Sequence, residues 1–139
     1  MSLPGLLVFL VLVSGAGRVC AEWMSLDARL ISSADGPLTL LLDKESIASS
    51  DDVVTVTFRM YWGAYSIDKQ NKPGMQINST FDCKRRRSNI NSGVYVDGAN
   101  GKFLPGQISP TEFRSIPADT ASELVFNHVC SKKWYQIWK

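Results

Sequence analysis

The densest group of side chains that could bind a ligand is the basic run Lys84, Arg85, Arg86 and Arg87, which directly follows Cys83. Four adjacent cations could bind a sulfated polysaccharide, an acidic protein or lipid headgroups. If a strand continued through the run, its side chains would alternate between the solvent face and the core side, so the four would not form one patch. The alternative interpretation is a solvated run that protects an exposed strand edge.

Cysteine is the second residue type that could carry chemistry. The chain has three cysteines, Cys20, Cys83 and Cys130. Loss of an N-terminal signal peptide would leave Cys83 and Cys130, and we expect them to form one disulfide, because exported proteins fold in an oxidising compartment. The bridge would close a loop of about 48 residues and contribute roughly 4 kcal/mol in the chain-entropy model. The alternative is two free buried thiols.

Catalytic and metal-binding groupings are not apparent in the sequence. The single histidine, His128, has no Cys, Asp or His at metal-ligand spacing, so we interpret it as a packed, hydrogen-bonded side chain. No serine occupies a G-x-S-x-G motif, and the adjacent Asp51 and Asp52 would point in different directions. We therefore expect a non-enzymatic protein without a metal or cofactor.

The N-terminal segment predicts export. Residues 6–13 form an unbroken apolar run, LLVFLVLV, followed by small residues and Val19-Cys20-Ala21. This pattern is typical of a secretory signal peptide, and the run is too short to span a bilayer. Cleavage after Ala21 would give a mature chain starting at Glu22, in the periplasm, at the cell surface or secreted. The alternative is a lipoprotein acylated on Cys20, although Val19 and Gly17 fit a lipobox poorly.

The composition after cleavage indicates one globular domain. Residues 22–139 number 118 and carry 14 basic and 13 acidic side chains. This near-neutral charge gives little long-range attraction to nucleic acid, which we do not expect as a partner. We divide the chain into a signal peptide (1–21), a domain (22–131) and an aromatic and basic tail (132–139).

The tail could contact a membrane interface or a partner groove. It places Trp134, Tyr135 and Trp138 among three lysines, and such rings combine an apolar body with a polar tip. The alternative is that the rings pack on the domain itself.

Period-2 alternation predicts two long antiparallel strands. Val53–Trp62 places Val54, Val56 and Phe58 on one face, and Met75–Lys84 places Cys83 on its core-facing side. A polar loop, 63–74, would join them. Further strands are predicted at 23–31, 38–42, 90–96 and 113–116, with turns at 35–37, 97–98 and a turn region from 100 that includes Pro105, Gly106 and Pro110.

A helix is predicted after these strands. Thr120 and Glu123 fit a capping box, and an apolar stripe continues to the region of Cys130. Strands followed by one helix indicate an α+β fold: an antiparallel sheet of about five to six strands, with the C-terminal helix on one face and pinned by the disulfide.

A set of short motifs resembles a known family. They are Trp23 after the export signal, Leu42-Asp43-Lys44-Glu45-Ser46-Ile47, Phe81-Asp82-Cys83 with the following arginines, Ile116-Pro117 and the closing Val129-Cys130. Together they resemble the bacterial surface-adhesin protein E family over nearly all of residues 23–130. The resemblance implies a small exported domain with an antiparallel sheet, a C-terminal helix and a disulfide.

The resemblance also implies a function. The founding adhesin of that family binds host matrix proteins such as vitronectin and laminin, so we expect a binding module of a Gram-negative bacterium that adheres to a host matrix protein or sulfated polysaccharide. The alternative is a periplasmic structural or envelope-associated protein without adhesin activity. The oligomeric state is not predicted by any pattern in the sequence.

Overall fold

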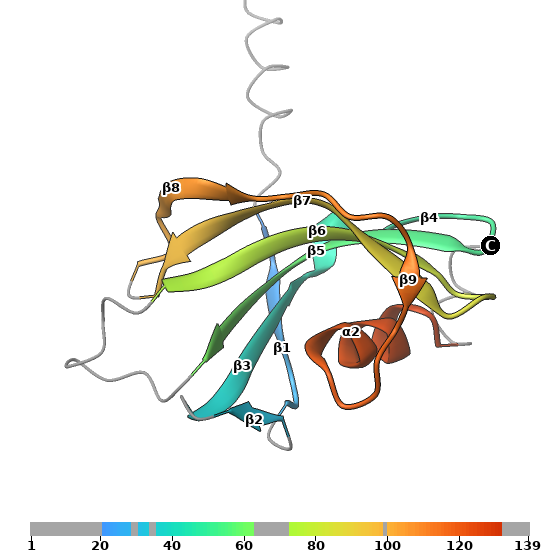
Figure 1. Cartoon of the computed structure of the whole chain (residues 1–139), viewed down its shortest axis with the longest axis horizontal. Coiled ribbons are helices and arrows are strands. Elements are labelled where there is room, and N and C mark those ends of the chain that lie inside the picture. The colour runs from blue at the N-terminus through green and yellow to red at the C-terminus, as the bar shows by residue number, and fades with distance from the viewer. Residues whose placement is uncertain (1–20, 29–30, 34–35, 63–72, 99, 132–139) are drawn as a thin grey trace, which may run out of the picture.

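Figure 1 shows the computed structural model of the chain, which describes residues 21–28, 31–33, 36–62, 73–98 and 100–131. The apolar run of the predicted signal peptide, Cys20, residues 63–72 of the predicted loop and the tail with Trp134, Tyr135 and Trp138 lie outside the described residues. The predictions made for those segments therefore stay predictions. No helix in the described ranges is long and apolar enough to cross a membrane.

The described residues form one antiparallel sheet in which the main strands follow the order β1-β3-β5-β6-β7-β8. Three short strands complete it: β2 pairs with β3, β4 with β5 and β9 with β7. The strands are β1 (Trp23–Leu26), β2 (Ser32–Ser33), β3 (Gly36–Asp43), β4 (Ala48–Ser50), β5 (Val53–Trp62), β6 (Pro73–Asp82), β7 (Arg87–Asp97), β8 (Phe103–Ile108) and β9 (Arg114–Ser115). A short 3-10 helix, η1 (Lys44–Ser46), follows β3. The α+β class is confirmed, and the nine strands of the described residues exceed the predicted five to six.

The long strands agree best with the alternation that predicted them. β5 spans the predicted Val53–Trp62, and its residues from Val53 to Met60 pair with β6 residues from Asp82 back to Met75. β6 begins at Pro73, within the predicted loop, and ends at Asp82, before the predicted Lys84. β1 ends at Leu26, so the predicted opening strand is shorter than expected.

The turn region predicted from residue 100 contains a strand that sequence reasoning missed. β8 includes Pro105 and Gly106, the two residues that most favoured a turn. Gln107 pairs with Val94 and Leu104 pairs with Tyr95, with a register irregularity between these pairs. Proline and glycine are tolerated here because β8 lies at the end of the strand order and the irregularity interrupts the hydrogen-bond ladder.

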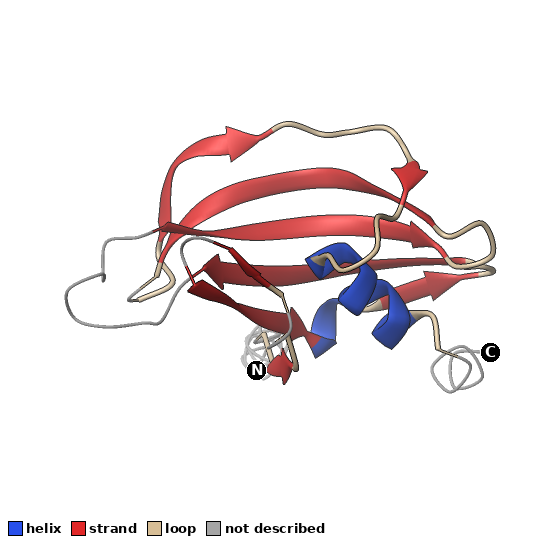
Figure 2. Ribbon diagram, turned by 60° about the horizontal axis from the view of Figure 1, so that its bottom comes forward, coloured by secondary structure: helices blue, strands red, loops and turns tan. Residues whose placement is uncertain are grey.

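The sheet arches over the C-terminal helix α2 (Ala121–Val129), which covers one face (Figures 1 and 2). The buried residues on the α2 side of β5 and β6 alternate along each strand and are apolar, with the exception of Ser79. Phe58 and Phe81 are almost fully buried there, and the Phe81 ring lies 6.3 Å from the Phe126 ring of the helix. We call this helix-covered side the inner face and the opposite side the outer face.

The helix begins where the capping box predicted. Thr120 Oγ1 accepts a hydrogen bond from the backbone N–H of Glu123, and the Glu123 carboxylate accepts one from the backbone N–H of Asp119. The carboxylate therefore caps the residue before Thr120 instead of Thr120 itself. The buried stripe comprises Ala121, Val125, Phe126 and Val129. Phe126, absent from the predicted stripe, is part of the core.

Candidate functional site

The predicted disulfide is present. Cys83 and Cys130 are bonded, with an S–S distance of 2.05 Å and a Cα–Cα distance of 5.4 Å. Cys83 follows the last residue of β6 and Cys130 caps the end of α2, so the bond attaches the helix to one end of the sheet. The backbone N–H of Cys83 also donates to the carbonyl of Asp52 at 2.8 Å. The start of the basic run is therefore held covalently and by the backbone.

The basic run does not continue a strand, because β6 ends at Asp82 and β7 begins at Arg87. Residues 83–86 form the turn between them, and Arg86 adopts a φ of 53°. All four side chains of the run, Lys84, Arg85, Arg86 and Arg87, are exposed. The alternation of faces considered for a continuing strand is therefore wrong for this run, which we call the basic turn (residues 84–87).

Asp82 organises the first half of the basic turn. Its Oδ1 accepts a hydrogen bond from the backbone N–H of Arg85 at 3.0 Å, and its Oδ2 accepts one from Nη1 of Arg85 at 3.2 Å. The backbone hydrogen bond, supported by the side-chain hydrogen bond and charge of Arg85, lowers the pKa of the Asp82 carboxyl below its ordinary value of 3.8. The ionised carboxylate thus fixes the path of the turn while neutralising part of its charge.

Arg86 connects the basic turn to the helix. Its Cζ lies 4.6 Å from the centre of the Phe126 ring, and its Nη2 lies 3.6 Å from Oε2 of Glu123. A guanidinium over an aromatic face is attracted by the ring quadrupole. Glu123 lies in the first turn of α2 and takes part in its capping, so Arg86 joins the basic turn to the start of the helix. The partner phenylalanine lies 40 residues further along the chain.

The remaining cations of the basic turn point to solvent in different environments. Arg87 has its Cζ 5.8 Å from the centre of the Phe113 ring, which is itself 38% exposed. Lys84 makes no ion pair with any residue in the described part of the chain. Arg114 pairs with Ser88 across β9 and β7 and adds an exposed cation beside the turn. The arrangement can bind an anion by charge and by guanidinium hydrogen bonds, with little rearrangement of the backbone.

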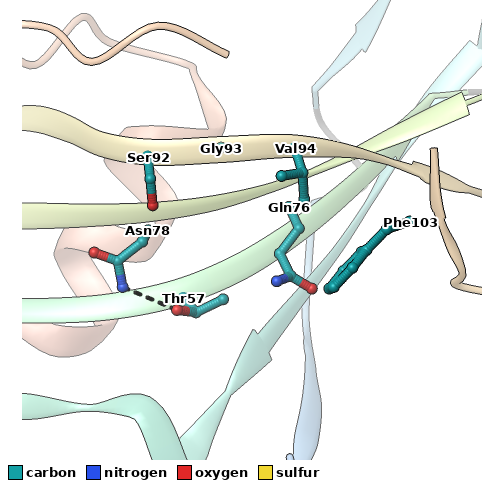
Figure 3. Close-up of a pocket in the computed structure, with 7 residues that line it drawn as sticks. All are labelled: Thr57, Gln76, Asn78, Ser92, Gly93, Val94 and Phe103. Carbon is teal, nitrogen blue, oxygen red and sulfur yellow. Dashed lines mark hydrogen bonds between the residues drawn. The ribbon is translucent and has the colours of Figure 1, made fainter. Parts of the chain in front are cut away.

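A second candidate site lies on the outer face, where β5, β6, β7 and the start of β8 surround a hollow of about 350 Å³ (Figure 3). We call it the outer-face hollow. The side chains that line it are neutral: Thr57, Gln76, Asn78, Ser92, Val94 and Phe103. Sequence reasoning missed this site. The available signal was the row of polar residues that alternates with the apolar ones in both β5 and β6.

His128 has its pKa lowered from 6.5 because burial disfavours the charged imidazolium. It lies half-buried on α2, as a packed histidine would. Among the described residues, no group of three His, Cys, Asp or Glu side chains could hold a metal ion.

The fold and the disulfide define a class: an antiparallel sheet with one helix on its inner face, pinned to the sheet by a Cys–Cys bond. A solved structure described as the structure of Haemophilus influenzae protein E shares this fold, with a TM-score of 0.55 over 84% of this chain and 89% of that chain. The two sequences are 13% identical, so the likeness concerns the fold. A scan against models of known protein families finds no match. A search of curated proteins finds none either.

Proposed function

We propose that the protein is an exported, non-enzymatic binding module that takes an anionic extracellular ligand at the basic turn. The observation that carries the proposal is the construction of that turn. Its four cations are exposed, and its backbone is held by the Cys83–Cys130 bond, by Asp82 and by the contacts of Arg86 with α2. A preorganised cation cluster binds without the entropy loss of ordering a flexible loop.

Two independent features support export. The N-terminal run has the pattern of a signal peptide, and β1 begins at Trp23, two residues after the expected cleavage at Ala21. The disulfide is the kind of bond that persists in the periplasm or outside the cell. Gel mobility and mass of the mature protein, with and without reductant, test this part. A mature chain starting at Glu22 that loses its cross-link on reduction is expected.

The ligand class follows from the chemistry of the turn and from the family resemblance. Guanidinium and ammonium groups bind carboxylates and sulfates, which acidic proteins and sulfated polysaccharides both supply. The adhesin-like motifs favour matrix proteins such as vitronectin and laminin, and the fold shared with protein E agrees with those motifs.

A solid-phase binding assay against immobilised vitronectin, laminin and heparin tests the proposal. The variant Lys84→Ala/Arg85→Ala removes two charges from the basic turn and leaves Arg86 on Phe126. The variant Lys44→Ala/Lys102→Ala removes the same charge from other exposed positions and is the matched control. We expect the first variant to lose at least one of the three interactions and the control to keep it. No binding by the wild type, or equal loss in both variants, would contradict the proposal.

Cell fractionation distinguishes this function from the periplasmic alternative. A surface-exposed or secreted pool, detected by protease treatment of intact cells, is expected of an adhesin. A soluble periplasmic pool without surface exposure would instead assign the protein to the cell envelope interior.

A further inference from the structure

The outer-face hollow has a floor of side chains whose positions are set by hydrogen bonds to one another. Nδ2 of Asn78 donates to Oγ1 of Thr57 at 3.0 Å (Figure 3). Oδ1 of Asn78 accepts from Nδ2 of Asn91 at 2.9 Å. Asn91 also donates to Oγ1 of Thr80 at 2.8 Å, which lies 3.0 Å from Oγ1 of Thr55. These amides and hydroxyls run across three strands, so Thr57 and Asn78, which line the hollow, are ordered before any ligand binds.

Gln76 supplies the first of two hydrogen-bonding groups that this network does not satisfy. Its Oε1 accepts a hydrogen bond from Nε of Arg59 at 2.8 Å, which orients the carboxamide and leaves its NH2 group without an acceptor among the described residues. Arg59 is fixed in turn by the Trp23 ring, whose centre lies 4.5 Å from its Cζ. Ser92 supplies the second group. It is exposed on β7, and its hydroxyl is turned toward Asn78 (Figure 3).

Phe103 forms the apolar side of the hollow. Its side chain comes from the first residue of β8 and is 66% exposed, although large apolar side chains are usually buried. In Figure 3 the ring lies beside Gln76, so a ligand in the hollow could contact both side chains. A flat, solvent-facing ring beside fixed amide and hydroxyl groups is complementary to a pyranose, which has apolar C–H faces and a rim of hydroxyl groups.

The surroundings argue against other ligand classes. No Asp, Glu, Lys or Arg is among the side chains that line the hollow, and the neighbouring Arg59 guanidinium is engaged by Gln76 and the Trp23 ring. The lining itself therefore offers no charge to a phosphate or a charged peptide. The backbone of β6 is paired on both sides, with β5 and β7, so the floor presents no free strand edge to which a peptide could add. The volume of about 350 Å³ lies within the ~300–1,000 Å³ usual for small-ligand sites.

We propose that the outer-face hollow is a binding site for a neutral oligosaccharide, with Phe103 stacking on one sugar ring and Gln76, Ser92 and Thr57 hydrogen-bonding its hydroxyl groups. This site is separate from the basic turn and does not depend on anionic ligand binding there. Because the ligand and the lining side chains are neutral, we expect binding at the hollow to be insensitive to ionic strength.

Titration of the ¹⁵N-labelled protein with neutral trisaccharides, followed by amide chemical shifts, tests the proposal. The probes are maltotriose, cellotriose and N,N′,N″-triacetylchitotriose, and a heparin-derived tetrasaccharide is the anionic comparison. At least one neutral probe is expected to shift the amides of Gln76, Val94 and Phe103 in a saturable manner at 50 and 300 mM salt. No such shift with any neutral probe would overturn the proposal, as would heparin alone shifting these amides.

Three variants separate the site from general surface effects. Phe103→Ala removes the stacking ring and is expected to weaken binding at least tenfold. Phe113→Ala removes another exposed phenylalanine outside the hollow and is expected to leave binding unchanged. Gln76→Met keeps the side-chain length but removes the whole carboxamide, both its NH2 donor and the oxygen that accepts from Arg59. It is expected to weaken binding by about fivefold, with circular dichroism confirming that each variant is folded. Undiminished binding by Phe103→Ala would contradict the assignment of this ring.

Discussion

The basic turn and the outer-face hollow are both open to solvent but are built in opposite ways. The basic turn carries four formal cations and is attached to the helix through Cys130, Phe126 and Glu123. The hollow is lined by neutral side chains in the middle of the sheet and is ordered by hydrogen bonds between neighbouring strands. The basic turn is held in place by contacts with core residues, and the hollow by hydrogen bonds within the sheet.

This difference determines how each region should respond to perturbation. Changes in the core are expected to disturb the basic turn, because its contacts end on residues that pack there. The same changes leave the hollow intact as long as the sheet is folded. Salt is expected to weaken binding at the turn and to have little effect at the hollow, since screening acts on charges.

The largest expected effect is that of Phe126→Ala. This side chain is 5% exposed, packs against Phe81 and carries Arg86 on its ring. Truncation leaves a cavity and lowers the free energy of unfolding by about 3–5 kcal/mol. Urea denaturation followed by circular dichroism measures this change, and a loss below about 1 kcal/mol would show that α2 is not essential to the core.

Removal of the disulfide comes next. Cys83→Ala/Cys130→Ala is expected to lower the free energy of unfolding by about 2–5 kcal/mol, because the unfolded chain gains the freedom of the opened loop. At low urea, amide hydrogen exchange should rise in the basic turn more than at Gln76 or Asn78. Equal exchange increases in the two regions would contradict the distinction between them.

Asn78→Ala should have a small effect on stability. Its hydrogen bonds to Thr57 and Asn91 are part-buried or exposed, so water can replace them, and a loss of about 0.5–1.5 kcal/mol is expected. Thermal unfolding beside the wild type measures the change. A loss as large as that of Phe126→Ala would mean that the outer-face network is part of the folding core.

The smallest predicted effect concerns pH and His128. Burial lowers the pKa of the folded imidazole below 6.5, so the unfolded state binds the proton more readily. Stability is therefore full above pH 6.5 and decreases as the pH falls from there toward the folded-state pKa. Thermal unfolding between pH 8 and 5 checks the direction, and His128→Gln should reduce this slope. A wild-type midpoint that rises on acidification through this range would contradict it.

Local sequence patterns were sufficient to predict the elements that are set by residues close together in the chain. β5 follows its alternation from end to end, and α2 begins at the capping box. The cysteine count and the expected export were enough to predict the disulfide.

Features that depend on distant residues were not predictable in this way. β8 was missed because Pro105 and Gly106 are turn-forming residues unless an edge position and a register irregularity accommodate them. The contact of Arg86 with Phe126 requires the helix to pack under the sheet. The outer-face hollow requires the registers of β5, β6 and β7 together, because its lining comes from adjoining strands.

The salt dependence of binding to a heparin-derived oligosaccharide tests the central claim most directly, because the basic turn is proposed to act through its charges. Isothermal titration at 50, 150 and 300 mM salt would compare the wild type with Lys84→Ala/Arg85→Ala. The account predicts that wild-type affinity falls steeply with salt, and that the variant binds more weakly with a shallower salt dependence. Wild-type affinity that is unaffected by salt, or a variant that binds as the wild type does, would contradict it.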